Sequence, residues 1–498
     1  MKTMKSSIAT GALVLAALND VYAQYTPPPP PAPFPGFLNE YLRQKDPYMA
    51  AWDFSSTVRM RYEVKENGLG LPPANDFRDE TVAGGLNDNS YFSQKILMRI
   101  GYTHQWWSAF VEGRSSGTTG DRRGDTGAPP VPGPGTGPES DGPIDLHQAY
   151  VTVGNHKEFP LSLKVGRQEL SYGDERLVGA FAWNNIGRVF DAIKVRAQTP
   201  WFAAEAFTSK LVLPDDNEFN VWNDYSLFSG LHLSSKLIPK NTAEAYFFAR
   251  NDDIGSSFAN PDAVLPFQTA APVSRDIYTL GARFKSNPGE FGNFDYTVEG
   301  AYQFGNWQQT LTSDNLDHEA FAVVANLGYT FAECAATPRL ALEYAFGSGD
   351  SDPNDGRHET FDNLFPTNHK FYGYMDFFSW QNLHDVRAIL SIKPLPRLSL
   401  AVEGHLFWLA DTRDNLYNAG GVARGGGPNS GGFGRNAEYS SFIGSEIDIV
   451  AGYALTRFAS LEAGYGHFFT GDYIDSTWAG AGGSADADWV YVQTVIRF

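Results

Sequence analysis

The sequence predicts an all-β protein, a transmembrane antiparallel β-barrel of about 18 strands with long extracellular loops and short periplasmic turns. Three observations predict this class. Apolar and polar residues alternate along much of the chain from Ala51 onward. The alternating segments are longer than the strands of soluble sheets, and short and long connections follow one another in turn. Fifty glycines and thirty prolines also argue against a mainly helical protein.

The composition limits the class of protein further. The 498 residues are 42% hydrophobic and 19% charged, which excludes a mainly disordered chain. A net charge of -19 argues against sequence-independent binding of nucleic acid. Cys334 stands alone, which excludes an internal disulfide and a multi-thiolate metal site, and we expect it to be buried or lipid-facing. No apolar run approaches the roughly 20 residues of a membrane-spanning helix.

The first fifty residues differ from the rest of the chain. Lys2 and Lys5 precede an apolar run and then small residues, so the sequence predicts a secretory signal peptide over residues 1–23. Five consecutive prolines at 27–31 indicate an extended spacer in a proline-rich periplasmic segment, residues 24–50. The barrel itself is predicted over residues 51–498.

Alternation with a period of two defines the predicted strands. In residues 52–64 nearly every even position is apolar and nearly every odd position is polar, and the pattern returns at 294–304, 339–346, 398–408 and 490–498. A soluble sandwich would also alternate. Lengths of about 9–13 residues fit a tilted bilayer crossing instead. Aromatic residues near strand ends, such as Tyr102, Trp107, Tyr329 and Trp489, suit interfacial girdles.

The connections give the strongest indication of a membrane barrel. Short links at 104–105, 198–200, 239–241 and 393–396 fall after every second strand. Long links are predicted after the others, at 65–90, 115–143, 168–188, 209–226, 251–276, 305–317, 347–383, 409–440 and 470–488. Short turns on one side and long loops on the other are typical of outer-membrane barrels, whose termini both lie in the periplasm.

The polar face of these strands predicts the wall of a pore. Acidic residues are interleaved with the inward-facing cations, so we expect at least half of the cations to form cross-strand ion pairs. A local arginine cluster that binds carboxylates is the sharper hypothesis. The predicted lumen cations on the strands are Arg59, Arg61, Arg99, Arg114, Lys164, Lys194, Arg196 and Arg387.

Three runs of sequence carry a resemblance to a known family. They are 164–195, which includes Lys164-Val165-Gly166-Arg167-Gln168; 360–385, which includes Thr360-Phe361-Asp362-Asn363-Leu364; and 444–469, which includes Gly444-Ser445-Glu446-Ile447-Asp448. Together they resemble the alginate export family of outer-membrane porins, over most of the chain from Trp52 to Phe498. The resemblance implies an eighteen-stranded barrel, export of a linear polyuronate through an arginine-lined constriction, and loops that fold into the bore as a gate.

The resemblance also implies particular residues for the solute path. Carried onto this sequence, the candidates are Arg167, Arg176, Arg188 and Arg196, with Asp191 as their acidic partner. Strict alternation places Arg167 on the same face as Val165, so a bore position requires a bulge or a place at the rim. The predicted lumen is mixed in charge, which makes alginate itself less secure than membership of the family.

Weaker patterns indicate no catalytic or metal centre. Asp350, Asp352 and Asp355 resemble the start of a calcium loop, but the glycine comes one place late and Phe361 stands where a glutamate is needed. We therefore expect a solvated loop, with calcium as the weaker alternative. No serine lies in a recognisable nucleophile context, so we predict no enzyme and no cofactor.

These observations together predict a channel in the outer membrane of a Gram-negative-type bacterium. The predicted solute is anionic, with export of an alginate-like polysaccharide as the first hypothesis. A general or small-organic-anion porin is the alternative, and an outer-membrane hydrolase is a second one. The predicted partners are outer-membrane lipid, the anion and an export component in the periplasm, and the barrel is expected to be monomeric.

Overall fold

A computed structural model describes most of the chain after the predicted leader. The described residues are 36–68, 76–79, 87–123, 139–155, 157–214, 219–223, 225–253, 274–308, 315–424 and 433–498. The predicted signal peptide at 1–23 and the prolines at 27–31 lie outside them.

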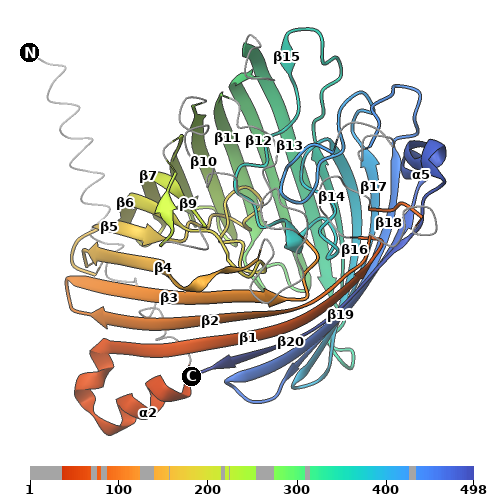
Figure 1. The fold of residues 1–498 in the computed structure, drawn as a ribbon. Helices are drawn as coiled ribbons and strands as arrows, with labels where there is room; N and C mark the ends of the chain where they lie inside the picture. The colour runs from red at the N-terminus through yellow and green to blue at the C-terminus, as the bar shows by residue number, and fades with distance from the viewer. Residues whose placement is uncertain are drawn as a thin grey trace, which may run out of the picture.

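The described residues form one closed antiparallel barrel of eighteen long strands (Figure 1). Each long strand pairs with the next one along the chain, and β20 pairs back onto β1 to close the wall. This confirms the predicted fold class and strand number. The long strands are β1 (Trp52–Glu66), β2 (Asn89–Thr103), β3 (Trp107–Thr119), β4 (Asp141–Val153), β5 (Leu161–Gln168), β6 (Phe190–Gln198), β7 (Phe202–Leu213), β9 (Ser226–Ser235), β10 (Asn241–Asp252), β11 (Arg275–Ser286), β12 (Phe294–Gln308), β13 (Asn315–Thr330), β14 (Arg339–Gly347), β16 (Leu383–Leu395), β17 (Leu398–Leu409), β18 (Phe442–Ala454), β19 (Ala459–Thr470) and β20 (Ala487–Arg497).

Two short strands attach to this wall. The two-residue β8 (Val221–Trp222) pairs with the end of β7, and β15 (Arg357–His358) pairs in parallel with β13. Both belong to long connections. They therefore add local contacts without interrupting the order of the long strands.

The alternation of the sequence becomes an alternation of environment. On β20, Val490 and Val492 are exposed on the outer face, whereas Trp489 and Tyr491 are buried on the lumen side. The prediction of Trp489 as a girdle residue was wrong, because its position in the strand turns it inward to donate to Glu63 at 3.0 Å. Trp52, Tyr102 and Trp107 do form a band at the outer face, with ring centroids 4.9 and 5.2 Å apart.

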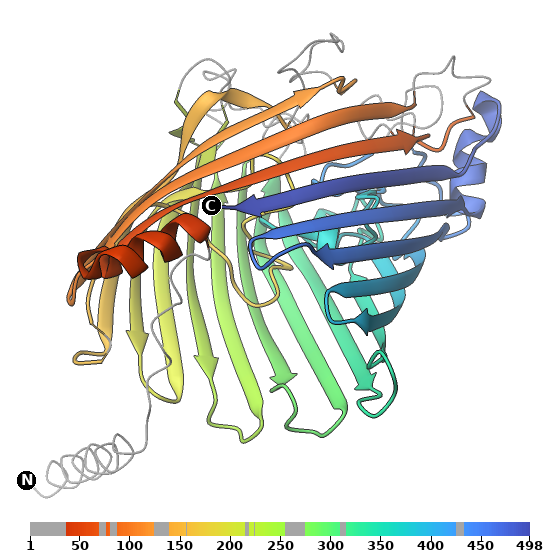
Figure 2. The ribbon, with the colours of Figure 1, turned by 90° about the horizontal axis from the view of Figure 1, so that it is seen from below.

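Short turns and long loops lie at opposite ends of the barrel. Figure 2 shows the strands leaning across the wall, with the start of β1 and the end of β20 at the end of the short turns. The connection predicted at 305–317 is shorter than expected, because β12 continues to Gln308 and β13 begins at Asn315. Cys334 is exposed in a short turn, so the prediction of a buried or lipid-facing position was wrong.

Long loops fill much of the lumen. Residues 169–189 and 348–382 fold inward, and the second segment includes the 3-10 helix η3 (Asn368–Lys370). They contribute Leu177, Phe365 and Trp380 to a buried apolar cluster. The last loop carries α5 (Asp472–Trp478) and η5 (Ala479–Ala481), and Trp478 is buried in the same cluster. Apolar packing therefore holds the inward loops in place.

A short helix precedes the barrel inside the segment predicted as proline-rich. This helix, α2 (Phe37–Lys45), is followed by the 3-10 helix η1 (Pro47–Ala51), which leads directly into β1. Among the described residues, none of the helices has both the length and the apolar character that crossing a membrane requires.

Candidate functional site

The first three strands carry lumen cations that are neutralised by neighbouring acids. The acids lie on adjacent strands or two residues away on the same strand, where side chains share a face. All of these side chains are nearly buried within the bore. The pairs are Arg61 with Glu63 (2.7 Å), Arg99 with Glu112, and Arg114 with Asp141.

Arg59 has a different environment. Its guanidinium donates to the carbonyl of Ala182 at 3.0 Å and to Oδ1 of Asn185 at 3.2 Å, both in the inward loop 169–189. These acceptors are neutral, and none of the carboxylates in the described residues forms an ion pair with Arg59. Arg59 therefore contributes a positive charge to the lumen that no direct ion pair in the described residues neutralises.

The predicted cations of β5 and β6 are also on the lumen face. Nζ of Lys194 lies 3.2 Å from Glu205, and Arg196 pairs with the same carboxylate. Nζ of Lys164 lies 3.5 Å from the ring centroid of Tyr150, which is a cation–π contact. One acid therefore serves two of these three cations.

Arg167 and Asp191 form the expected pair, but not in the bore. Nε of Arg167 lies 2.9 Å from Oδ1 of Asp191, its partner in strand register. Both residues have the strand parity of the lipid-facing Val165 and Ile193. Arg167 also donates to the carbonyl of Asn220 at 2.9 Å. β5 pairs with β6 without a bulge, and the pair lies at the rim, where β5 ends at Gln168 and β6 begins at Phe190. A role of Arg167 and Asp191 in the solute path stays a prediction.

Arg176 and Arg387 share an acid across the lumen. Nη2 of Arg176, from the inward loop, lies 2.7 Å from Glu343 on β14. Arg387 lies 3.5 Å from the same carboxylate and pairs with Glu403. The Arg176 guanidinium also lies 3.8 Å from the ring centroid of Phe371. Arg176 thus ties the two inward loops to the wall.

Arg188 is the loop arginine that lacks such a partner. Its Nη1 donates to the carbonyls of Gly179 at 3.2 Å and Pro366 at 2.8 Å. Burial lowers the pKa of Arg188, and the positive charge of Arg250 lowers it further. Within the described part of the chain no carboxylate forms an ion pair with it. Like Arg59, it is held by neutral acceptors.

The lumen contains a cavity of about 520 Å³ with a mainly basic lining, toward the periplasmic ends of β1, β2 and β20. Arg59 and Lys95 form part of its wall, and Nζ of Lys95 donates to the carbonyl of Asn184 at 3.1 Å. Glu169 is its one lining acid among the described residues. The five lining cations are Arg59, Lys95, Arg99, Lys370 and Arg497. Two of them are paired with acids outside the lining, Arg99 with Glu112 and Lys370 with Glu175 at 2.7 Å. We call this space the inner cavity.

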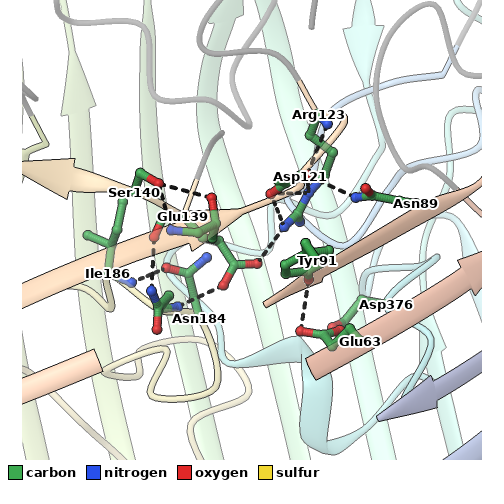
Figure 3. A network of polar contacts seen from close by, with 12 residues as sticks. Glu63, Asn89, Tyr91, Asp121, Arg123, Glu139, Ser140, Asn184, Ile186 and Asp376 are labelled. Atoms are coloured by element: carbon green, nitrogen blue, oxygen red, sulfur yellow. Dashed lines mark hydrogen bonds and ion pairs between the residues drawn. The ribbon is translucent and has the colours of Figure 1, made fainter. Parts of the chain in front are cut away.

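A second cavity of about 150 Å³, the outer cavity, lies nearer the extracellular ends of the strands. Its charges are mixed, and a polar network at its edge joins loops to the wall (Figure 3). Arg123 lies 2.8 Å from Asp121 and 3.2 Å from Glu139, while Tyr91 donates to Glu63 at 2.8 Å. Its charged lining residues in the described chain are Lys65, Arg123, Arg188, Arg424, Glu63, Glu139 and Asp376.

Trp183 lines both cavities. Its ring stacks on His369 from the other inward loop, with centroids 3.8 Å apart, and Arg61 lies 4.0 Å from the ring centroid. Neither Trp183 nor His369 was predicted as a site residue, because a loop has no periodicity that assigns a side chain to a face. The charge pattern of the strands gives no signal for an aromatic side chain that separates two cavities. Trp183 marks the boundary between the inner and outer cavities.

The aspartates of the weak calcium candidate serve the loop backbone. Asp350 accepts the amide of Asp352 at 3.1 Å, and Asp355 accepts that of Arg357 at 2.9 Å. Asp352 accepts the amide of Asn354 at 3.2 Å. In the described residues no group of three or more His, Cys, Asp or Glu side chains is arranged to hold a metal ion. The aspartates therefore act as turn residues.

A comparison with protein families decides the relationship of this barrel. The model of the family described as "Alginate export" matches residues 52–485. The chain belongs to the alginate export family. No curated protein matches the chain.

Solved porin structures share the fold of this family member. OccAB2 of Acinetobacter baumannii is 10% identical, with a TM-score of 0.55, over 90% of this chain and 98% of that one. OccAB4 of the same organism is 10% identical, with a TM-score of 0.53 and the same coverage. OpdO of Pseudomonas aeruginosa is 13% identical, with a TM-score of 0.51, over 90% and 97%. At this identity the likeness concerns the fold.

Family and fold together make this chain an outer-membrane channel rather than an enzyme. Its surroundings are the lipid of a Gram-negative outer membrane, which the exposed apolar face of the strands contacts.

Proposed function

We propose that this channel conducts anionic solutes that carry carboxylates, and that its solute is a linear polyuronate of the alginate type. The observation that supports the proposal is the inner cavity, which is lined by five cations and one acid. Membership of the alginate export family supports the polymeric solute. The periplasmic position of the basic cavity fits export, because an anion arriving from the periplasm meets it first.

The inner cavity would act by lowering an electrostatic barrier. A cation about 4 Å from a carboxylate stabilises it by about 1 kcal/mol in water and by more in a partly dry bore. Arginines add a planar fork that matches a carboxylate, which Arg497 in the lining would present to a sugar acid, while Arg59 acts through its charge. Passage also requires release. The mixed charges of the outer cavity, where Glu63 and Glu139 face Arg123, would keep anions from binding too tightly.

A small-organic-anion porin is the second candidate function. The outer cavity favours it, because about 150 Å³ accommodates a small anion more readily than a polymer. A polymer would need the inward loops to move apart at Trp183. The same cations would attract either kind of solute. The two candidates therefore differ in the length of the solute, not in its charge.

Conductance across a planar bilayer separates the candidates. Oligouronates of increasing length, their single-sugar acid and neutral oligosaccharides of equal length are added from each side in turn. A polyuronate channel is blocked by the longer oligouronates, and more strongly from the periplasmic side. Block by the single-sugar acid alone would indicate a small-anion porin. Equal block by neutral oligosaccharides would contradict both.

A further inference from the structure

The helix α2 packs its polar face against the protein and exposes its apolar face, the reverse of a surface helix in a soluble protein. Asn39 is buried at 2% exposure, whereas Phe37, Leu38 and Tyr41 are 46%, 39% and 56% exposed. In a helix of a soluble protein the apolar face normally turns toward the core. Here Leu38 and Tyr41 face away from the protein and about half of Phe37 is left uncovered, so this face needs an apolar surrounding of another kind.

The polar face of α2 is fixed to the rim of the barrel. Asn39 donates to Asp53 and accepts the backbone amide of Phe54 at 2.7 Å. Arg43 donates to the carbonyl of Trp52 at 2.7 Å. These contacts join the helix to the first residues of β1. They set its rotation and leave little freedom to turn the apolar face inward.

A second set of contacts joins α2 to the end of the chain. The ring of Phe37 lies 5.2 Å from that of Phe498 and 6.2 Å from that of Phe458 in the β18–β19 turn. Glu40 forms an ion pair with Arg457 at 2.5 Å. The helix therefore spans the periplasmic rim from this turn to the start of β1, beside the C-terminus (Figure 2).

These contacts also give the side of the wall on which the apolar face lies. Phe498 has the strand parity of the lipid-facing Val490 and Val492, so Phe37, which packs against it, is on the lipid side. At the other end of the helix, Trp52 begins the outer aromatic band that continues through Tyr102. The apolar face of α2 is thus continuous with the lipid-facing surface of the barrel.

The charges at the end of α2 match a phospholipid surface. Its last turn carries Arg43 and Lys45 and no acid. Nζ of Lys45 lies 5.6 Å from the ring centroid of Tyr41, on the apolar side. A lysine beside an aromatic ring suits the headgroup level, where its stem contacts apolar groups and its ammonium meets phosphate.

We infer that α2 is an interfacial membrane anchor that seats on the periplasmic leaflet of the outer membrane. Its apolar face enters the boundary between headgroups and acyl chains, and Lys45 contacts lipid phosphate. Amphipathic helices bind in this way at a depth of about 5–10 Å. The anchor holds the segment before β1 over the seam between β1 and β20. The inference rests on the barrel in its membrane and not on the solute.

Site-specific fluorescence in vesicles tests this. The full chain with Cys334→Ser and Tyr41→Cys is labelled with an environment-sensitive probe and inserted into vesicles of phosphatidylethanolamine and phosphatidylglycerol. The unaltered chain, labelled at the exposed Cys334 in a short turn, is the matched control. A lipid-attached quencher and iodide on both sides of the membrane then report the surroundings of each probe.

We expect the emission of the probe at position 41 to shift to shorter wavelength, to be quenched by the lipid-attached quencher and to resist quenching by iodide. The probe at Cys334 should be quenched by iodide and not by the lipid-attached quencher. Adding Leu38→Asp should abolish quenching by lipid at position 41, while heat-dependent gel migration shows that the barrel still forms. Equal access of iodide to both probes would overturn the inference. So would protection at position 41 that disappears on dilution with lipid, because a second copy of the chain would then cover the face.

Discussion

Replacing Arg59 by glutamine removes from the inner cavity one positive charge that has no direct ion pair, and leaves its neutral acceptors within reach of a hydrogen-bonding side chain. In the described residues the guanidinium donates to neutral acceptors of the loop, Ala182 and Asn185, so glutamine removes no ion pair from a buried acid. A carboxylate passing within about 4 Å of a cation in a water-filled bore gains about 1 kcal/mol. Loss of that term corresponds to about a fivefold fall in anion permeability, since 1.4 kcal/mol is tenfold.

Reversal potentials measured on single channels in asymmetric potassium gluconate give the ratio of gluconate permeability to potassium permeability directly. The control removes a pair that is already neutral. This control is the double variant Arg339→Gln/Asp295→Asn. In the unaltered protein Arg339 on β14 and Asp295 on β12 form an ion pair at 2.5 Å, and neither residue lines the inner cavity. The control should keep the wild-type ratio, whereas Arg59→Gln should lower it about fivefold. An equal ratio in wild type and Arg59→Gln would refute the role of the inner cavity.

Three further predictions concern the loops. Trp183→Ala should join the two cavities and raise single-channel conductance, whereas the exposed Trp222→Ala should not; unchanged conductance would show that Trp183 is no partition. Arg176→Gln removes one of the two cations that pair with Glu343, and breaking a buried pair costs up to about 3–5 kcal/mol. The inward loop should then be held less firmly, so the noise of the single-channel current should rise. It should rise less in Arg176→Gln/Glu343→Gln, which leaves no unpaired acid at this position. Burial and the neighbouring Asp414 raise the pKa of Asp350 to about 6, so docking of loop 348–362 is strongest near pH 4 and weakens as the pH rises through about 6. Amide hydrogen exchange in this loop, corrected for the pH dependence of the chemical exchange rate, should therefore become faster as the pH rises through about 6. Asp350→Asn should remove this dependence on pH.

The wall of the barrel was predictable because lipid and lumen impose a period of two. Every strand has one face in each surrounding, so Val490, Tyr491 and Val492 reveal their orientation from order alone. The same rule correctly placed Arg167 beside Val165 on the outer face. Of the two alternatives for Arg167, a bulge or a place at the rim, the regular pairing excludes the bulge, and Arg167 lies next to the last residue of β5.

The interior was not predictable to the same degree, because its contacts join loops that are distant in the sequence. Trp183 meets His369, and Arg176 meets Glu343, across more than 160 positions of the printed sequence. No local pattern announces such pairs. The helix α2 was missed for a related reason. Its apolar side chains face outward, so its amphipathic pattern has meaning only beside a membrane surface.

The sign of the wild-type reversal potential tests the central claim most directly. A single channel is recorded in a planar bilayer between concentrated and dilute potassium chloride at neutral pH, with the orientation of the protein established. An inner cavity lined by five cations and one acid predicts a reversal potential that reports preference for chloride. A potential that reports preference for potassium would contradict the account.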